Sequence, residues 1–139
     1  MKVIILCGGK GTRLREETEY KPKPMVEIGK IPILMHIINI YTYYGFNEFI
    51  LALGYKGDVI RDYFLSHEYY NNDFTITLGN QRCIDIHNNF SIPDCKVTLA
   101  ETGDETMTGG RIKMCERYIN EDHFMVTYGD GSQILTLSS

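Results

Sequence analysis

A glycine-rich run with basic and hydroxyl side chains follows the first apolar stretch of the chain. Residues 6–13 have the sequence Leu-Cys-Gly-Gly-Lys-Gly-Thr-Arg. Glycines carry no side chain, so their backbone N–H groups can approach an anion closely. Arg13 offers a planar fork for phosphate oxygens, and Lys23 offers a compact positive charge. We therefore predict that this run binds phosphate groups.

A local excess of positive charge supports this prediction, although the whole chain has a net charge of −4. Between positions 10 and 23 lie Lys10, Arg13, Arg15, Lys21 and Lys23. Such a cluster in an acidic protein suits a small anionic ligand, whereas the overall charge argues against nucleic acid or an anionic membrane as the partner. The alternative is a solvated loop whose glycines serve only a turn. The position directly after an apolar stretch favours phosphate binding.

Two familiar phosphate-binding loops do not fit this run. The P-loop requires a lysine after its last glycine, whereas Lys10 precedes Gly11. The dinucleotide fingerprint requires a third glycine where this chain has Leu14, whose side chain would obstruct close helix packing. The run therefore represents another kind of phosphate loop.

A second candidate for chemistry is Gly129-Asp130-Gly131, which follows another apolar stretch. A carboxylate at such a position can hold Mg²⁺ against phosphate oxygens, although an aspartate between glycines is also a common turn residue. Nucleotidyl transfer needs in-line positioning and charge neutralisation rather than a protein nucleophile. Glu101, Asp104 and Glu105 could also approach a metal, but we expect them in a solvated loop.

The elements that must position these residues alternate between strand and helix. Apolar and alternating runs predict strands at 3–6, 49–53, 74–78, 83–86, 96–101 and 124–128, with a further element from 134. The strand at 74–78 should have one solvated face. This order predicts an α/β fold with a doubly wound, mostly parallel, Rossmann-like sheet. Ligands of such sheets bind outside the carboxyl ends of the strands, where both glycine motifs fall.

Three helices are expected between these strands. An apolar helix at 33–44 should be deeply packed, and Asp58 should cap a short helix that follows the second strand. The third helix, at 111–118, should be amphipathic, with its apolar face formed by Ile112, Met114, Cys115 and Tyr118.

Several motifs together resemble the sugar-1-phosphate nucleotidyltransferases. The run at 6–14 is followed by Lys-Pro-Lys-Pro-Met-Val at 21–26, which is similar to the signature of that family. The stretches at 54–57 and 102–111 and the sequence Tyr-Gly-Asp-Gly at 128–131 resemble the glucose-1-phosphate cytidylyltransferase branch. The resemblance extends from Met1 to about Gly131.

This resemblance implies transfer of CMP from CTP to glucose 1-phosphate, with CDP-glucose and pyrophosphate as products, in nucleotide-sugar and polysaccharide biosynthesis. It implies catalytic roles for Arg13, Lys23 and Asp130, of which Asp130 would bind Mg²⁺. Thr106 and Arg111 would lie in a loop near the nucleotide. The full set of residues implied to bind the substrate is Leu6, Gly8, Gly9, Lys10, Gly11, Thr12, Arg13, Lys23, Thr106, Arg111 and Asp130.

The length of 139 residues predicts one nucleotide-binding domain, 1–139, resembling the N-terminal part of a family whose members are nearly twice as long. The sugar-binding half is not recognisable. Four cysteines without metal-like spacing and the lack of a long apolar run predict a reduced, cytoplasmic protein outside the membrane. Three hypotheses stay open: a cytidylyltransferase, a nucleotide-binding or interaction module without turnover, and an inactive fragment. A homo-oligomer is compatible with each.

Overall fold

Strand β1 (Lys2–Leu6) lies at the centre of a five-stranded sheet. A computed structural model describes residues 1–8, 21–87, 94–131 and 134–138. In this sheet β1 is flanked by β4 (Glu48–Leu53) and β8 (His123–Tyr128), and the edges are β7 (Lys96–Glu101) and β9 (Ile134–Ser138). The β1, β4, β7 and β8 strands are parallel, and only β9 runs antiparallel among these five. The predicted doubly wound, mostly parallel sheet is confirmed.

The strands form where the sequence has continuous apolar runs. Val3, Ile4 and Ile5 of β1 are completely inaccessible to solvent, as expected for a strand covered on both faces. Val3 pairs with Phe49 on one side, and Lys2 pairs with Phe124 on the other. The first and the last parallel strands in the sequence are therefore neighbours in space.

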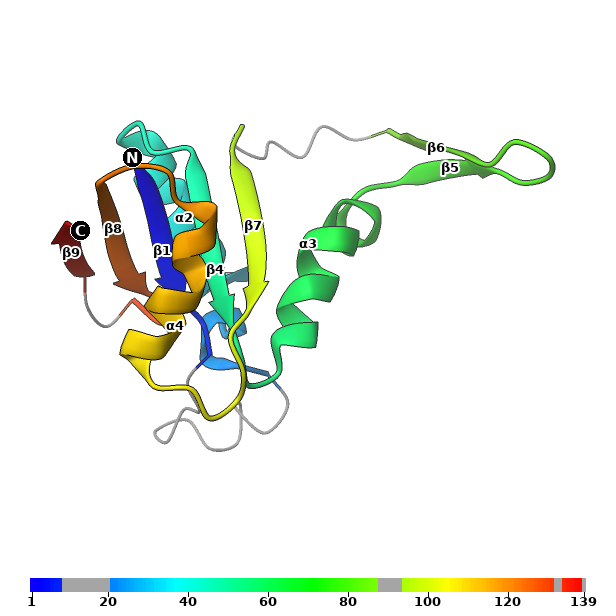
Figure 1. The fold of residues 1–139 in the computed structure, drawn as a ribbon. Coiled ribbons are helices and arrows are strands. Elements are labelled where there is room, and N and C mark those ends of the chain that lie inside the picture. Colours follow the sequence, from blue (N-terminus) through cyan, green and yellow to red (C-terminus); the bar gives the residue numbers. More distant parts are fainter. Residues whose placement is uncertain (9–20, 88–93, 132–133, 139) are drawn as a thin grey trace.

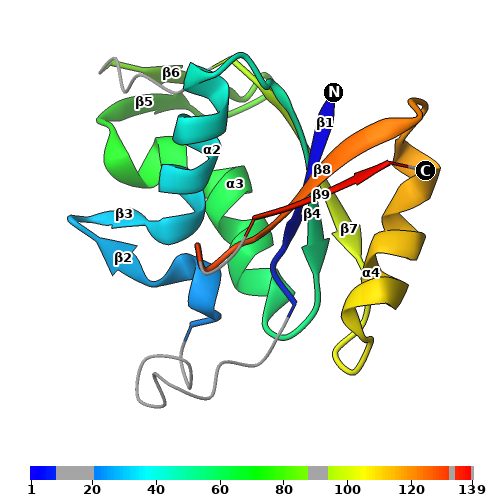
Figure 2. The same ribbon diagram turned by 90° about the vertical axis from the view of Figure 1, so that its left-hand side faces the viewer.

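Helices cover both faces of the sheet (Figure 2). On one face α2 (Ile33–Tyr43) and α3 (Gly57–Asn71) enclose a core that includes Ile38, Leu51 and Ile60. On the other face α4 (Thr108–Cys115), continued by the 3-10 turn η2 (Glu116–Tyr118), covers a smaller core. The helix expected after Pro32 is present as α2, and five of its side chains are buried. The expectation that the whole helix is deeply packed is wrong, because Ile40 and Tyr43 are 56% and 84% exposed.

Two helix predictions need correction. Asp58 lies in the first turn of α3 and makes no capping hydrogen bond; the residue at the cap is Lys56, which has a left-handed backbone with φ of 53°. The helix α4 begins at Thr108 rather than at residue 111. Its sequence suggested a later start because two glycines, which disfavour helices, occupy the first turn.

The face that α4 buries is also different from the predicted one. Met114 and Tyr118 are 46% and 38% exposed, whereas Arg111 and Cys115 are buried. A charged side chain therefore occupies part of the face that hydrophobic periodicity assigned to apolar residues.

A hairpin of β5 (Phe74–Thr77) and β6 (Cys83–Ile86) projects beyond α3, away from the sheet (Figure 1). The alternation in β5 suggested one buried face, but Phe74 is 42% exposed and Ile76 is only partly covered. The expected strand is present, but its expected burial is wrong: Phe74 contacts the ring of Tyr69 in α3, with 5.8 Å between ring centroids, and still stays largely exposed.

Two short strands and one turn complete the described structure. The 3-10 turn η1 (Lys23–Met25) leads into a ribbon of β2 (Glu27–Ile28) and β3 (Ile31–Pro32). Within the described residues, no helix combines the length and the apolar character needed to cross a membrane.

Candidate functional site

The carboxyl ends of the parallel strands meet at one edge of the sheet (Figure 1). The chain passes from β1 to β4 and β7 on one side and then returns to β8 on the other side of β1. This change of direction is the switch point at which doubly wound sheets bind ligands. A pocket of about 360 Å³ opens there. Its lining residues are Leu6, Cys7, Gly8, Lys23, Pro24, Thr106, Met107, Thr108, Arg111, Tyr128 and Asp130.

Six of the residues expected to bind substrate line this pocket. They are Leu6, Gly8, Lys23, Thr106, Arg111 and Asp130, and they come from four separate stretches of the chain. The expected residues Gly9, Lys10, Gly11, Thr12 and Arg13 lie outside the described residues. The structure therefore brings together the two ends of the candidate site, while the middle of the glycine-rich run stays a prediction from sequence.

Lys23 and Asp130 form an ion pair in the lining of the pocket. Lys23 Nζ lies 3.5 Å from Asp130 Oδ2, and each side chain is about one-quarter exposed. Both Lys23 in η1 and Asp130 after β8 are therefore accessible to a ligand, and each has a charge that a metal–phosphate complex could satisfy.

The turn after β8 explains the glycines on either side of Asp130. The Gly129 N–H donates to Leu6 O at 2.9 Å, which extends the β1–β8 pairing into the turn. A Cβ at Gly129 would lie 3.0 Å from Pro24 Cγ and 3.1 Å from Cys7 Sγ, so a larger residue would push into the pocket wall. Gly131 has φ of 76°, which favours glycine. Asp130 is thus a turn residue and a pocket residue at once.

Arg111 is the most deeply buried charged side chain of the pocket, with 5% of its surface exposed. Its Nη1 donates to Thr102 Oγ1 at 2.8 Å, and its Nη2 donates to the carbonyl oxygens of Gly8 and Asp104, each at 3.3 Å. All these acceptors are neutral, and no carboxylate among the described residues lies within ion-pair distance of the guanidinium. Buried charges are normally paired, so an anion in the pocket would complete this site.

Two glycines provide the space that this guanidinium occupies. A Cβ on Gly8 would lie 2.0 Å from Arg111 Nη1 and 2.5 Å from Cζ, and a Cβ on Gly54 would lie 2.4 Å from Nη1. Gly8 was expected to be a glycine so that its backbone could approach an anion. In the structure, the volume of its missing side chain is taken by Arg111.

Arg111 lies within α4, as the predicted helix at 111–118 placed it, and not in the loop that the family resemblance implied. Thr106 keeps its place in the segment between β7 and α4 and lines the pocket. A Cβ on Gly110 would lie 2.9 Å from the methyl carbon of Thr106. The glycine in the first turn of α4 therefore lets Thr106 pack close to the helix.

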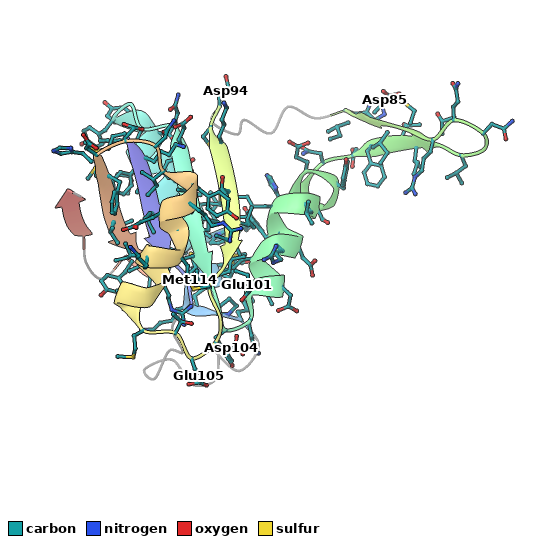
Figure 3. All side chains as sticks on the ribbon, viewed as in Figure 1. Asp85, Asp94, Glu101, Asp104, Glu105 and Met114 are labelled. Atoms are coloured by element: carbon teal, nitrogen blue, oxygen red, sulfur yellow. The ribbon has the colours of Figure 1, made fainter. Side chains whose placement is uncertain are left out.

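The nearby acidic residues do not join the pocket lining. Glu101 pairs with Arg61 at 3.4 Å and accepts a hydrogen bond from the Gly103 N–H at 3.3 Å. In Figure 3, Glu105 points away from the sheet at the bottom of the molecule. Among the described residues, no three His, Cys, Asp or Glu side chains form a metal-binding group. The expectation of a solvated loop fits Asp104 and Glu105, whereas Glu101 is the last residue of β7.

A protein nucleophile is not supplied by the cysteine of the pocket. Burial, followed by the proximity of Cys115 and Asp130, raises the pKa of the Cys7 thiol far above its ordinary value. The thiol therefore stays protonated, and its Sγ donates weakly to Ile5 O at 3.5 Å. The pocket is suited to holding charged groups in position rather than to covalent catalysis.

The donor set is compatible with Mg²⁺ when a phosphate ligand is present. Mg²⁺ sites commonly use one or two carboxylates and complete their octahedron with water and substrate phosphate oxygens. Asp130 supplies one partly exposed carboxylate at the pocket. Asp130 would therefore hold the ion only together with the phosphate oxygens of the ligand.

Sequence reasoning missed two residues of this network, Thr102 and Gly54. Thr102 is completely buried, and Gly54 follows β4. Both were noticed only as parts of stretches that resemble the cytidylyltransferases. No periodicity or spacing links them to Arg111, because the contacts join different strand ends.

Comparisons with known proteins agree with this fold and identify the family. The family described as nucleotidyl transferase matches residues 2–131. The "Probable glucose-1-phosphate cytidylyltransferase" of Bacillus subtilis is 48% identical over 133 residues, which are 94% of this chain and 50% of the relative. The glucose-1-phosphate cytidylyltransferase of Salmonella typhimurium is 48% identical over 132 residues, which are 94% of this chain and 51% of the relative.

A solved structure has a similar fold. The crystal structure of HddC from Yersinia pseudotuberculosis in complex with GMP-PN superposes with a TM-score of 0.66 at 32% identity. The match covers 93% of this chain and 47% of HddC. The chain thus spans about half the length of the curated relatives and of the solved structure that it matches.

Proposed function

The chain belongs to the nucleotidyl transferase family, and on this basis we propose that its pocket binds the triphosphate of CTP as the nucleotide-binding part of a glucose-1-phosphate cytidylyltransferase. The observation that carries the proposal is the buried Arg111 guanidinium, which has only neutral partners among the described residues and faces a pocket at the switch point of the sheet. An anion of high charge density is the ligand that such a group favours.

In the proposed reaction, a phosphate oxygen of glucose 1-phosphate attacks the α-phosphorus of CTP. The new P–O bond gives CDP-glucose, and the bond to the β-phosphate breaks to release pyrophosphate. The protein accelerates this exchange by holding the two substrates in line and by neutralising charge on the phosphate oxygens.

We assign these tasks to the charged residues around the pocket. Lys23 would exchange its contact with Asp130 for a phosphate oxygen, and Arg111 would supply positive charge from beneath. Arg13 and the other residues from Gly9 to Thr12 would hold the phosphates through backbone N–H groups and the guanidinium fork, as their sequence predicts. Asp130 would hold Mg²⁺, which when bound would neutralise charge on the phosphates.

The preference for CTP rests on the 48% identity with the two cytidylyltransferases. The chain spans about half of their length. A module that binds CTP without turnover is the second candidate, because the described pocket is formed by groups suited to holding a nucleotide. The proposed substrates and the four free cysteines are both consistent with a reducing, cytoplasmic location.

The two candidates differ in turnover. We expect the chain, supplied with CTP, Mg²⁺ and glucose 1-phosphate, to release pyrophosphate, and we expect Asp130→Ala to abolish this release. Asp85→Ala is a matched control, since it removes an exposed aspartate from the distant hairpin (Figure 3). CTP binding without pyrophosphate release would favour the module.

A thermal-shift series with CTP, UTP, dTTP and ATP tests the base. The largest shift should occur with CTP. A larger shift with dTTP would contradict the cytidylyl assignment, and no shift with any of the four would contradict a nucleotide site.

A further inference from the structure

The Arg111 guanidinium is hydrogen-bonded to the ends of three strands, two of them through one buried hydroxyl group. Thr102 follows β7, is completely buried, and accepts a hydrogen bond from Arg111 Nη1 at 2.8 Å. Its own Oγ1 donates to Leu53 O, the last residue of β4, at 2.7 Å. Arg111 Nη2 also donates to Gly8 O, two residues after the end of β1. One side chain from α4 therefore joins the carboxyl ends of β1, β4 and β7.

The direction of these hydrogen bonds is determined by chemistry. A guanidinium has only donors, and a carbonyl oxygen only accepts. A hydroxyl group placed between them must donate to the carbonyl and accept from the guanidinium. Thr102 Oγ1 satisfies both neighbours in this way, while the Thr102 N–H also donates to Leu53 O at 2.8 Å. Thr102 is therefore held by two hydrogen bonds to one carbonyl, which leaves its hydroxyl oxygen in a defined place.

From this arrangement we propose that Thr102 is a positioning residue, which fixes the Arg111 guanidinium beneath the phosphate-binding end of the pocket. Without the hydroxyl group, the guanidinium loses its shortest hydrogen bond, the one donated by Nη1, and is free to turn between Gly8 and Gly54. This inference rests on the proposed function in one respect: the ligand whose binding reports the position of Arg111 is CTP.

The test compares Thr102→Val, which has nearly the same shape without the hydroxyl, with Thr102→Ser, which keeps it. Calorimetry with CTP, inorganic tripolyphosphate and cytidine separates the phosphate contribution from the base. In Thr102→Val we expect affinity for CTP and tripolyphosphate to fall about tenfold, the scale of one charge-assisted hydrogen bond. Affinity for cytidine should stay within about twofold of wild type, because Arg111 acts on phosphate alone. In Thr102→Ser all affinities should stay within about threefold of wild type, since its hydroxyl accepts the same bond.

A residue with a merely structural role would give a different pattern. Thr102→Val would then unfold at a lower temperature while binding CTP and tripolyphosphate as tightly as wild type, and that result would overturn the inference. Equal weakening with cytidine and with tripolyphosphate would overturn it as well.

A second measurement does not depend on a ligand. Held by three hydrogen bonds, the Nη groups of Arg111 should give separate ¹⁵N–¹H resonances in the wild-type chain, and these should merge in Thr102→Val. Merged resonances in the wild type would refute the positioning of Arg111 even if CTP binds. If wild-type chain binds neither CTP nor tripolyphosphate but keeps separate resonances, the proposed function fails and the positioning role stands.

Discussion

Replacing Gly8 by alanine should destabilise the chain through Arg111 and not through the backbone. The φ angle of Gly8 lies outside the left-handed region, so the local conformation does not require glycine. The added Cβ would instead lie 2.0 Å from Nη1, 2.5 Å from Cζ and 3.1 Å from Nε of Arg111. Because the guanidinium is the end of a flexible side chain, we expect it to leave its position and give up its hydrogen bonds.

The size of the effect follows from those hydrogen bonds. One is short at 2.8 Å and two are long at 3.3 Å. At roughly 1 kcal/mol for each hydrogen bond, somewhat more for the short charged one and less for the long ones, the loss is about 2.5 kcal/mol. For a chain of this size, about 4 °C per kcal/mol then predicts a decrease in Tm of roughly 10 °C.

A double-mutant cycle with Arg111→Ala isolates this cause. Once the guanidinium is absent, the Cβ on Gly8 no longer meets its three nearest neighbours, and Gly8→Ala should change the free energy of unfolding by less than about 0.5 kcal/mol. The coupling energy between the two sites should therefore be about 2 kcal/mol. Urea unfolding followed by far-ultraviolet circular dichroism measures all four chains, provided that their m-values agree. Equal costs of Gly8→Ala in both backgrounds would refute the reasoning, because the glycine would then be required by something other than Arg111.

Two further predictions concern α4 and the cysteines. Gly109→Ala should raise the free energy of unfolding by about 0.5–1 kcal/mol, since its Cβ would meet no atom within 4 Å. Gly110→Ala should give no such gain, since its Cβ would lie 2.9 Å from Thr106 Cγ2. Equal urea midpoints for the two variants would contradict this prediction. A thiol reagent should label exposed Cys83 in the native chain and spare Cys115, whose pKa is raised by burial from 9.0 to about 11. Because this group binds its proton more tightly when folded, its contribution to stability is complete below pH 9 and is lost as the pH rises towards 11; this part of the pH dependence should be absent in Cys115→Ala.

The sequence predicted the sheet well because strands buried on both faces consist of continuous apolar runs that are visible locally. Val3 to Leu6 and Phe49 to Leu53 are continuous, bounded by glycines, and lie in the observed strands. Errors arose where tertiary contacts override local preference. Arg111 lies on the buried face of α4 because neutral acceptors and two glycines accommodate it, a circumstance that helical periodicity does not contain.

The candidate site was predictable in a similar measure. The shared position of Lys23 and Asp130 at one pocket could be predicted from the motif resemblance and from the rule that strand ends meet at one edge. The contact between Gly8 and Arg111 was not, since it joins residues far apart in the chain through a hydrogen bond and a missing side chain. Nothing in the residues around position 8 distinguishes a glycine required by a ligand from one required by a distant arginine.

The central position of β1 also has consequences for the nascent chain. During synthesis β1 leaves the ribosome before β4 and β8, and one of its hydrogen-bonding edges lacks its native partner until β8 has emerged. An apolar strand with an unpaired edge is a template for association between chains, and pairing over such a sequence distance is slow. The pocket can form only after β8 has emerged, because its lining includes both Gly8, which follows β1, and Asp130, which follows β8. A ligand that needs the complete pocket therefore cannot assist the early stages of folding, when β1 depends on the elements already synthesised for cover.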